Sequence, residues 1–535
     1  MNEMQADARK APQQDIFLSS TDEPAHPIEV EVKFRTDAKS QGQVLRSPLL
    51  GPAAARKAQT LRSIYFDSKN LDLLKHGVVL RVRKTGQSGP VMCVKFQGSQ
   101  RDGVFQRREI EVKSPDLSPD LKLFDETTAA KLLRILDGQK FEPQFETRIK
   151  RRLRHVTTGT LSVEVAIDEG FIALPDGRQE PLREVELELK SGEPADLYDL
   201  ASRLAMELSL TLDFASKPET GFALFKPETS VPRKAAALVL DEHASLDMAV
   251  VAVISNTLRQ FASNWTPLRN SDDPESVHQL RVSLRRMRIA LKMFKRVLPC
   301  QAFDGIRADA KQIATALGPA RELDIFILGA ADGPLQYGGK PHGCADLMAA
   351  AAEARASAYR AARALIDDPQ TTLFVLKLQS LVARGAWRSE LPSTDLPLLT
   401  SPAKEIAVSI LDWLQARVSK RGKRLMQLSD EERHELRIAL KDLRYGVEFF
   451  SGPFGHGRRV RTLLKTVSAL QDLLGRHNDS VSTEKLVQIF SQGLGAEAVR
   501  AAGYVTGWHA RGIAMAEAEL EKLWKSFKSQ RPFWH

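Results

Sequence analysis

The chain has little cysteine and no long apolar segment. Its three cysteines, Cys93, Cys300 and Cys344, are far apart in 535 residues and lack the spacing of metal ligands. No disulfide framework is needed, which fits a reducing cytoplasm. No apolar run approaches the roughly 18 residues of a membrane span. Residues 1–22 are polar and lack the apolar core of a signal peptide, so we expect residues 1–25 to be a disordered lead.

The composition is that of a soluble protein with an uneven charge. The chain is 43% hydrophobic and 27% charged, and its length predicts about three folded units. Residues 1–230 hold 34 Lys and Arg against 35 Asp and Glu, a net charge of −1, and residues 231–535 hold 43 against 32, a net charge of +11. The basic second half predicts a polyanionic partner: nucleic acid, a membrane surface or an inorganic phosphate chain.

Residues 28–34 alternate between apolar and charged side chains. Strict alternation predicts a half-buried strand, because successive side chains leave a strand on opposite faces. Glu29, Glu31 and Lys33 would then share one face. Two carboxylates about 7 Å apart raise each other's pKa unless a cation lies between them, and the neighbouring lysine suits a phosphate. The segment predicts half of a metal and phosphate site, with an ordinary solvated strand as the alternative.

Further strands are predicted at residues 62–67, 78–83, 91–96, 106–112, 145–154, 161–167 and 183–190, with a helix at residues 127–136. The last strand repeats the acidic alternation through Glu184, Glu186 and Glu188. Two acidic stripes in one sheet repel each other, and a divalent cation is the simplest relief. If the sheet closes into a barrel, charged side chains line an interior that holds water and an ionic ligand, and helices cover the apolar outside.

These residues resemble a known family. The alternation from Glu29 to Lys33, the run through residues 65–67 and 80–83, the strand with Glu186 and Glu188, and residues 216–221 are similar to the CYTH domain, or triphosphate tunnel metalloenzymes, over about residues 26–226. That family includes class IV adenylate cyclases, thiamine triphosphatases and inorganic triphosphatases. The resemblance implies an α+β domain with an eight-stranded antiparallel β tunnel or barrel and flanking helices, in which carboxylates hold Mg²⁺ or Mn²⁺ and basic side chains bind a triphosphate.

The resemblance also implies three groups of site residues. The metal ligands would be Glu29, Glu31, Asp168, Glu186 and Glu188. The substrate-binding residues would be Lys33, Arg62, Arg81, Arg83, Lys95, Arg108, Arg151 and Lys217. Glu29, Glu31 and Lys33 would be catalytic, with a metal-polarised water attacking in line and arginines stabilising charge on the transferred group.

Beyond a proline-containing linker at residues 227–240, the pattern becomes helical over residues 241–535. An internal repeat organises this half: residues 277–288 align with 433–444 at an offset of 156, and residues 317–322 align with 474–479 at an offset of 157. Asp273 with Pro274, and a capping box that begins at Ser429, mark the starts of the two repeated helices. The repeat predicts two halves, at about residues 241–388 and 403–535.

Basic residues recur on one face of each repeated helix. A histidine is followed by Arg at i+3, Arg or Lys at i+7 and Arg at i+10, beside an apolar stripe. Cations on one face repel one another unless an anion lies across them. Few aromatic residues are interleaved, so a phosphate chain fits better than single-stranded nucleic acid. The alternatives are a solvated basic face and, for the histidines, a structural role in the core.

This half resembles the CHAD domain, an α-helical family named for its histidines. The likeness lies in the two histidine-containing helices and the two Leu-Gly turns. It implies an all-α duplication of four-helix bundles that binds inorganic polyphosphate in a basic channel. The residues implied are His278, Arg281, Arg285, Arg286, Arg288, His434, Arg437, Lys441 and Arg444.

Patterns and resemblances together predict metal-dependent hydrolysis of inorganic triphosphate in the front domain and polyphosphate binding by the helical domain. Class IV adenylate cyclase or thiamine triphosphatase activity would use the same tunnel, and a non-enzymatic polyphosphate-binding scaffold is the third alternative. No membrane partner is expected, and nucleic acid is disfavoured. The predicted location is the cytoplasm, with association with polyphosphate granules as an extension.

Overall fold

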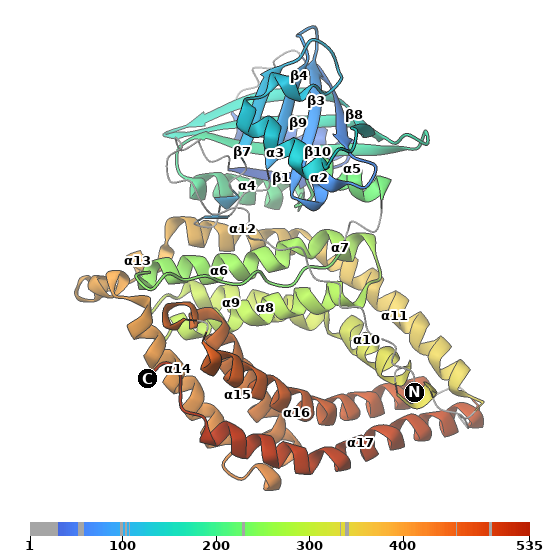
Figure 1. Ribbon diagram of the computed structural model, residues 1–535, viewed down its shortest axis with the longest axis vertical. Coiled ribbons are helices and arrows are strands. Elements are labelled where there is room, and N and C mark those ends of the chain that lie inside the picture. Colours follow the sequence, from blue (N-terminus) through green and yellow to red (C-terminus); the bar gives the residue numbers. More distant parts are fainter. Residues whose placement is uncertain are drawn as a thin grey trace.

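The chain folds into a β sheet stacked on an array of helices (Figure 1). The computed structural model describes residues 30–51, 58–96, 100–101, 104–105, 108–226, 231–331, 333–336, 342–455, 457–491 and 495–535. The predicted lead at residues 1–25 and Glu29 lie outside these ranges. Within them, no helix is long and apolar enough to cross a membrane.

A nine-stranded antiparallel sheet forms the first part, in the order β11-β1-β10-β9-β8-β2-β3-β4-β7. The strands are β1 (Glu31–Arg35), β2 (Gln59–Asp67), β3 (Val78–Thr85), β4 (Val91–Phe96), β7 (Arg108–Lys113), β8 (Glu142–Thr158), β9 (Leu161–Ala173), β10 (Gln179–Ser191) and β11 (Thr211–Leu212). All the predicted strands are present. The count exceeds the expected eight because the two-residue β11 pairs with β1. A separate hairpin joins β5 (Gln100–Arg101) and β6 (Val104–Phe105).

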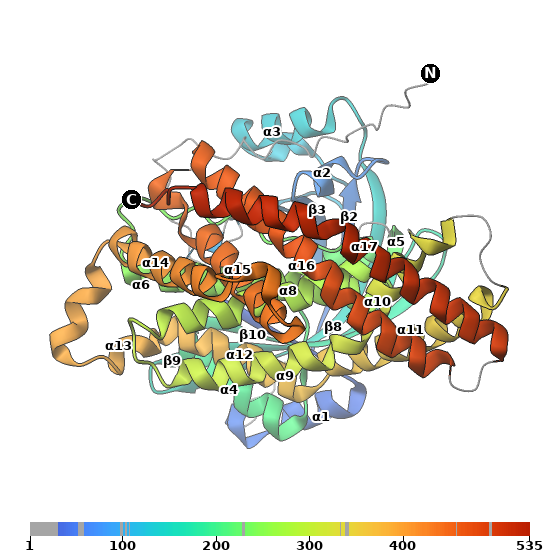
Figure 2. The same cartoon turned by 90° about the horizontal axis from the view of Figure 1, so that it is seen from below.

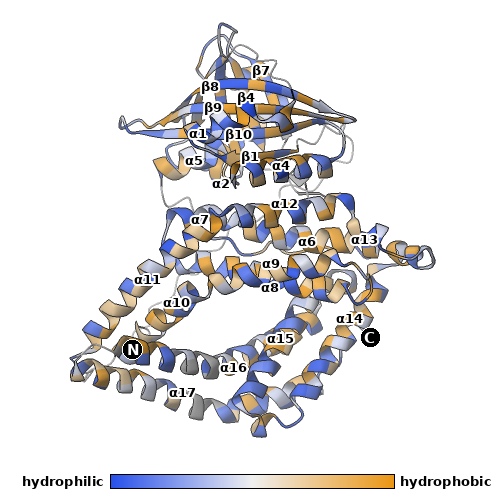
Figure 3. Cartoon of the chain, turned by 180° about the vertical axis from the view of Figure 1, so that it is seen from behind, coloured by the Kyte–Doolittle hydropathy of each residue, from blue (hydrophilic) through white to orange (hydrophobic). Residues whose placement is uncertain are grey.

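The outer face of the sheet is apolar and covered by helices. Val32, Val165 and Leu187 of β1, β9 and β10 belong to one core with α1 (Ala38–Arg46) and α4 (Pro194–Leu208), and Leu80 and Val94 of β3 and β4 belong to another with α3 (Glu126–Leu136). Because the side chains alternate, the charged residues of these strands point to the inner face. Figure 3 shows this mixture of hydrophilic and hydrophobic residues along the strands. The prediction of an apolar exterior under helices is confirmed.

One end of the inner face is apolar, which differs from the wholly ionic interior that the sequence predicts. Tyr65 of β2 stacks on Phe145 of β8 with ring centroids 4.5 Å apart, and Phe145 meets Phe222 of α5 (Lys217–Phe225) edge-on at 5.1 Å. A Cβ added at Gly221 would lie 2.1 Å from a Phe145 ring carbon, so this approach requires glycine. Helix α5 closes this end, and its first residue, Lys217, enters the interior.

The second part is helical, as its period predicts. The helices are α6 (Leu246–Ser263), α7 (Trp265–Asn270), α8 (Pro274–Phe294), α9 (Ala302–Ala316), α10 (Gly318–Ala331), α11 (Cys344–Ile366), α12 (Pro369–Arg384), α13 (Ala386–Ser389), α14 (Ala403–Arg421), α15 (Asp430–Phe450), α16 (Arg458–Ser491) and α17 (Ala496–Ser529). Helix α12 lies against α4 beneath the sheet (Figure 1). Seen from below, α15, α16 and α17 cross the side away from the sheet (Figure 2).

The predicted repeat is visible in the helix starts. Helices α6, α8 and α9 begin at residues 246, 274 and 302, and α14, α15 and α16 begin at 403, 430 and 458, so the offsets are 157, 156 and 156. The two halves also meet reciprocally: Leu246 N donates to Ser401 O at 2.9 Å, and Ala403 N donates to Ala244 O at 2.8 Å. Equivalent positions thus contact each other across a local pseudo-twofold axis. The division of each half into a four-helix bundle stays a prediction.

Candidate active site

Three carboxylates lie together on the inner face of β9 and β10. Asp168, Glu184 and Glu186 each offer an oxygen within 4.8 Å of the others, because Glu184 and Glu186 alternate on β10 and Asp168 lies opposite Glu184. Lys217 joins them from α5: its Nζ is 2.9 Å from Asp168 Oδ2 and 2.7 Å from Glu186 Oε1, and it also contacts Glu184. We call these four residues the deep cluster.

Two strand residues add positive charge to the deep cluster. Arg151 of β8 donates to both oxygens of Asp168 at 2.7 and 2.6 Å and to Glu186 at 2.8 Å. Lys33 Nζ of β1 is 3.6 Å from Glu184 Oε2. The three carboxylates are therefore matched by three cations: Lys33, Arg151 and Lys217.

Burial and ion pairing act in opposite directions on this cluster. Burial raises the pKa of Glu186, but Lys217 and Arg151 bring it well below its ordinary value. Burial lowers the pKa of Lys217, but Glu186, Glu184 and Asp168 raise it well above its ordinary value. Burial raises the pKa of Glu184 in spite of Lys33 and Lys217. Lys217 and Glu186 consequently stay charged at neutral pH.

A basic wall continues along β3 and β4. Arg81 is 2.9 Å and Lys95 is 2.5 Å from the carboxylate of Glu109 on β7, and Arg83 Nε donates to Ser63 Oγ at 3.1 Å. Although burial raises it, Lys95 and Arg81 bring the pKa of Glu109 down to about 2. Arg81 also lies 3.9 Å from Glu111, so the three cations of this wall outnumber its two carboxylates and can bind further oxygen anions.

A second acidic group lies at the other end of β10. Glu31 on β1 is opposite Glu188, and Glu188 is opposite Glu164 on β9. Like charges directly opposite each other in an antiparallel sheet are destabilising. Lys190 Nζ is 2.5 Å from Glu188 and 3.8 Å from Glu164. We call Glu31, Glu164 and Glu188 the rim acids.

Both the deep cluster and the rim acids offer carboxylate oxygens to a divalent cation. Carboxylate oxygens are the ligands that Mg²⁺ prefers. In the deep cluster a divalent ion would have to displace Lys217 or Arg151, which already neutralise the negative charge of the carboxylates. Lys190 and His155, which lie beside Glu188 and Glu164, are 40% and 38% exposed, so a divalent ion there could replace either of them without leaving an unpaired cation buried.

The structure sorts the predicted residues into these groups. Asp168, Glu186, Lys33, Arg151 and Lys217 meet in the deep cluster or its surroundings, Arg81, Arg83 and Lys95 form the basic wall, and Glu31 and Glu188 are rim acids. Glu29 and the side chain of Arg108 lie outside the described residues.

Arg62 is not brought to the interior. Its side chain lies on the outer face of β2, is 45% exposed, and pairs with Glu146 at 2.8 Å. The reason is strand parity: Ser63 and Tyr65 are buried on the inner face, so Arg62 between its neighbours points outward.

Four inward carboxylates were missing from the predicted site: Glu109, Glu111, Glu164 and Glu184. Glu184 contacts both Lys33 and Lys217, and Glu109 and Glu111 lie beside Cys93 on the basic wall. The signal was present in the sequence, since Glu184 shares the parity of Glu186, and Glu109 and Glu111 alternate on one strand. Burial also raises the pKa of the Cys93 thiol to about 12, so this thiol is neutral.

The repeated basic helices bring their arginines to equivalent places. Arg281 of α8 contacts the carbonyl oxygen of Ala314, and a Cβ added at Gly318 would lie 3.4 Å from its Nη1. In the second half, a Cβ at Gly475 would lie 3.2 Å from Nη2 of Arg437. Each arginine thus lies against the glycine of its Leu-Gly motif, so both motifs of the repeat meet in space. Leu317-Gly318 lies at the junction of α9 and α10, but Leu474-Gly475 lies within α16, so the predicted turn is absent from the second copy.

Burial and neighbouring cations lower the pKa values of His278 and Arg281. Burial and the charge of Arg321 lower the pKa of His278 to about 4. Burial and Arg285 lower the pKa of Arg281 to about 10. An anion bound against these residues would reverse both shifts.

Arg286 does not share this basic face. It is buried, donates to Gln260 at 2.8 Å and Asn256 at 2.9 Å, and lies over the Phe449 ring. One residue of an α helix turns the side chain by about 100°, so Arg286 leaves the face that carries Arg285 and enters the contact with α15. The prediction that Arg286 belongs to the polyphosphate-binding residues is therefore wrong.

An antiparallel sheet with an ion-paired inner face, joined to a duplicated helical array with two basic helices, defines a two-domain class of protein. Residues 27–222 match the CYTH domain family, and residues 252–488 match the CHAD domain family. The chain consists of a CYTH domain followed by a CHAD domain, which confirms the resemblance read from the sequence.

Known proteins resemble each domain separately. The inorganic triphosphatase of Haemophilus influenzae is 28% identical over 164 residues, which are 31% of this chain and 46% of that protein. The match thus spans about half of that relative. The CHAD domain from the plant Ricinus communis is 30% identical and covers 56% of this chain and 98% of its own, with a TM-score of 0.49. HpAC1 of Hippeastrum, a putative adenylyl cyclase with a dominant triphosphatase activity, is 22% identical and covers 38% of this chain and 95% of its own, with a TM-score of 0.27.

Proposed function

We propose that the CYTH domain hydrolyses inorganic triphosphate with a divalent metal ion, and that the CHAD domain binds inorganic polyphosphate. The observation that carries the first part is the placement of Arg81, Arg83 and Lys95 on the same inner face of the sheet that carries a separate group of acids. A triphosphate needs cations along its whole length and a metal near its reacting end. The relative named an inorganic triphosphatase supports this assignment.

The basic wall would bind and orient the substrate. Arg81, Arg83 and Lys95 offer N–H donors to phosphate oxygens from adjacent strands, and arginine can bind such oxygens in a bidentate manner. Arg151 and Lys217 would hold the chain from the deep cluster. Their ion pairs fix these side chains before substrate arrives, so little reorganisation is needed at the reaction.

Two of the rim acids would hold the metal. Glu31 and Glu188, together with Glu29, are the proposed ligands, and Mg²⁺ or Mn²⁺ is the proposed ion. When bound, the ion neutralises terminal phosphate charge and lowers the pKa of a coordinated water. The chain's own arginines would stabilise the charge on the transferred phosphoryl group.

The CHAD domain would bind polyphosphate through the repeated basic faces. His278, Arg281, Arg285 and Arg288 supply one face, and His434, Arg437, Lys441 and Arg444 supply the other. The support is the equivalent placement of Arg281 and Arg437 in the two repeats, together with the neighbouring cations that lower the pKa values of His278 and Arg281, an effect that an anion would oppose. The basic excess of this half adds long-range attraction for a polyanion.

A substrate panel tests the enzymatic part. The purified full chain is assayed with triphosphate, polyphosphate, thiamine triphosphate and ATP, with and without Mg²⁺. We expect phosphate release from triphosphate that requires the ion. Cyclic AMP and pyrophosphate from ATP would instead indicate a cyclase, preference for thiamine triphosphate would indicate that activity, and polyphosphate binding without turnover would indicate a scaffold.

A further inference from the structure

The chain between β11 and α5 is held by the helical domain. Leu212 N of β11 donates to Oγ1 of Thr372 on α12 at 2.9 Å, and Thr372 is fully buried. Phe214 packs edge-on against Trp265 of α7 with ring centroids 5.1 Å apart. The segment 211–216 is therefore part of the interface between the two domains.

One charged contact of this segment comes from the helical domain. Arg269 of α7 pairs with Asp213 Oδ1 at 3.5 Å and also contacts Asp367 at the end of α11. The Arg269 and Asp213 side chains are only 13% and 15% exposed. Because both are largely shielded from water, this pair constrains the segment more than a surface pair would.

Asp213 links that contact to two lysines of the tunnel. Its backbone N donates to the carbonyl oxygen of Lys33 at 2.9 Å. Its Oδ1 accepts from Ala215 N at 3.0 Å, which forms a tight turn directly before the capping box that begins α5. Lys217, the first residue of α5, then reaches the three carboxylates of the deep cluster.

We propose that Arg269 of the CHAD domain is a positioning residue for the tunnel of the CYTH domain, acting through Asp213 on Lys217 and Lys33. The inference rests on the proposed triphosphatase activity and goes beyond it, because a residue of the phosphate-chain-binding domain then tunes substrate binding in the catalytic domain. Arg269 does not touch the deep cluster. It fixes the turn from which Lys217 enters it.

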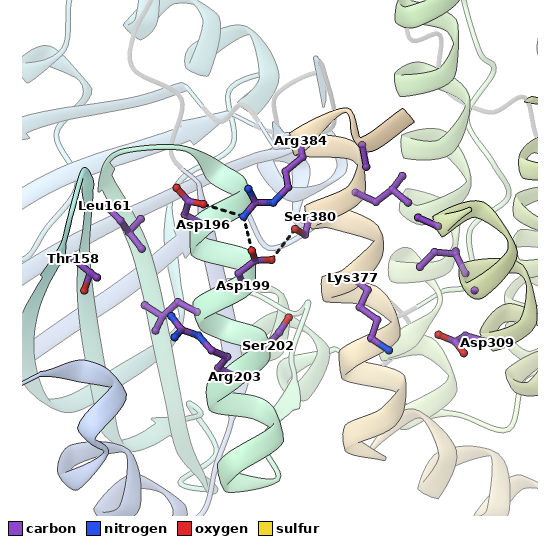
Figure 4. Close-up of a pocket in the computed structure, with 16 residues that line it drawn as sticks. Thr158, Leu161, Asp196, Asp199, Ser202, Arg203, Asp309, Lys377, Ser380 and Arg384 are labelled. Atoms are coloured by element: carbon purple, nitrogen blue, oxygen red, sulfur yellow. Dashed lines mark hydrogen bonds and ion pairs between the residues drawn. The ribbon is translucent and has the colours of Figure 1, made fainter. Parts of the chain in front are cut away.

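The interface offers a matched control. Arg384 of α12 pairs with Asp196 at 3.0 Å and also contacts Asp199 on α4, and Ser380 donates to Asp199 at 2.8 Å (Figure 4). This arginine also joins the two domains through aspartates, but α4 lies on the outer face of the sheet. Its loss should weaken the interface without displacing Lys217.

The experiment compares Arg269→Gln, Asp213→Asn and Arg384→Gln in the full chain, with steady-state kinetics on triphosphate and Mg²⁺. We expect Arg269→Gln to raise KM about fivefold or more with kcat changed less than about twofold, as for a lost binding interaction. Asp213→Asn keeps the turn acceptor and should reproduce the effect. The double variant should add nothing further, since both changes break one contact.

Further variants separate a positioning role of Arg269 from a role in folding. Arg269→Lys should recover most of the KM, and Asp367→Asn, which removes the other partner of Arg269, should leave KM near that of the wild type. If Arg269→Gln does not fold, Asp213→Asn alone decides the outcome. If the wild type is active and Arg269→Gln, Asp213→Asn and Arg384→Gln have equal KM values, this inference is overturned and the proposed function stands. A wild type that neither binds nor hydrolyses triphosphate would overturn the proposed function and this inference with it.

Discussion

Lys292 of α8 and Asp442 of α15 form an ion pair, with 2.9 Å between Nζ and Oδ2, across the contact of the two repeated helices. The reciprocal pair joins Arg286 to Glu448 at 3.9 Å. At the repeat offset of 156, Arg286 is equivalent to Asp442 and Lys292 to Glu448. The first copy therefore carries cations where the second carries anions, so the pseudo-twofold contact becomes complementary instead of repulsive.

This reversal predicts a stability cost for removing one charge. Asp442 is buried and also accepts from Arg417 at 2.7 Å. We expect Asp442→Asn to lower the free energy of unfolding of the helical domain by about 2–3 kcal/mol, since Lys292 and Arg417 lose a shared partner. Denaturant unfolding of the full chain measures this effect. Glu448→Gln should lower the free energy of unfolding by less than about 1 kcal/mol, because the ion pairs of Glu448 are longer and its side chain is more exposed than that of Asp442. Equal effects of the two variants would contradict the ion-pair account.

Removing the proposed metal ligands should separate the two activities. Glu29→Gln with Glu31→Gln should lower triphosphate turnover by about a hundredfold or more and leave polyphosphate binding unchanged, because the CHAD domain does not use these residues. The control is Glu146→Gln with Glu169→Gln, two outward carboxylates that pair with surface arginines. Retained turnover in the first double variant would exclude its metal role.

The repeated arginines should govern polyphosphate affinity. Arg281→Ala with Arg437→Ala should weaken binding and reduce the slope of log K against log salt by about one or two, because each phosphate contact releases a counterion. Affinity is measured at several salt concentrations. Lys84→Ala with Lys150→Ala removes the same charge from the outer face of the sheet. If both pairs change the slope equally, the basic faces bind no chain and are merely solvated.

Polyphosphate binding should take up protons at mildly acidic pH. Burial, Arg321, Arg285 and Arg281 outweigh Glu275 and hold the pKa of His278 at about 4 in the free protein. A bound polyanion raises that pKa, so affinity should increase as the pH falls from about 6.5 toward 4. Without polyphosphate, the effect of pH is on folding stability and has the opposite sign. The unfolded chain binds the proton at a higher pH than the folded chain does, so the stability of the free protein falls as the pH falls over the same range. Calorimetry in two buffers of different ionisation enthalpy measures the uptake, and His278→Gln should abolish it. Uptake that persists in His278→Gln would assign the proton to another group.

Much of the sheet could be predicted from the sequence because alternation is local. Lys33, Arg81 and Lys95 each lie between apolar neighbours on a strand, and Arg83 shares the parity of Arg81, so alternation puts these residues on the face opposite the apolar one. The repeat could also be predicted from the sequence, and the structure agrees with it, since matching helices begin at nearly constant offsets.

The remaining features depend on contacts that the sequence does not display. Arg62 also lies on a predicted strand, but its parity is opposite to that of Tyr65, and only the position of the core decides which face is inside. The apolar end of the tunnel requires α5 to return and place Phe222 on Phe145. The pairing of Lys217 with three carboxylates likewise comes from chain segments that are distant in sequence.

The central claim is that the inward cations of the sheet bind triphosphate, and two adjacent residues of β3 test it most directly. Arg83 lies on the inner face beside Ser63, and Lys84 is exposed on the outer face. We measure KM for triphosphate with Mg²⁺ in Arg83→Ala and Lys84→Ala. Loss of a hydrogen bond to a charged group costs about 1.5–3 kcal/mol, so KM should rise about tenfold to a hundredfold in Arg83→Ala and stay near the wild-type value in Lys84→Ala. Equal KM values for the two variants would contradict the account.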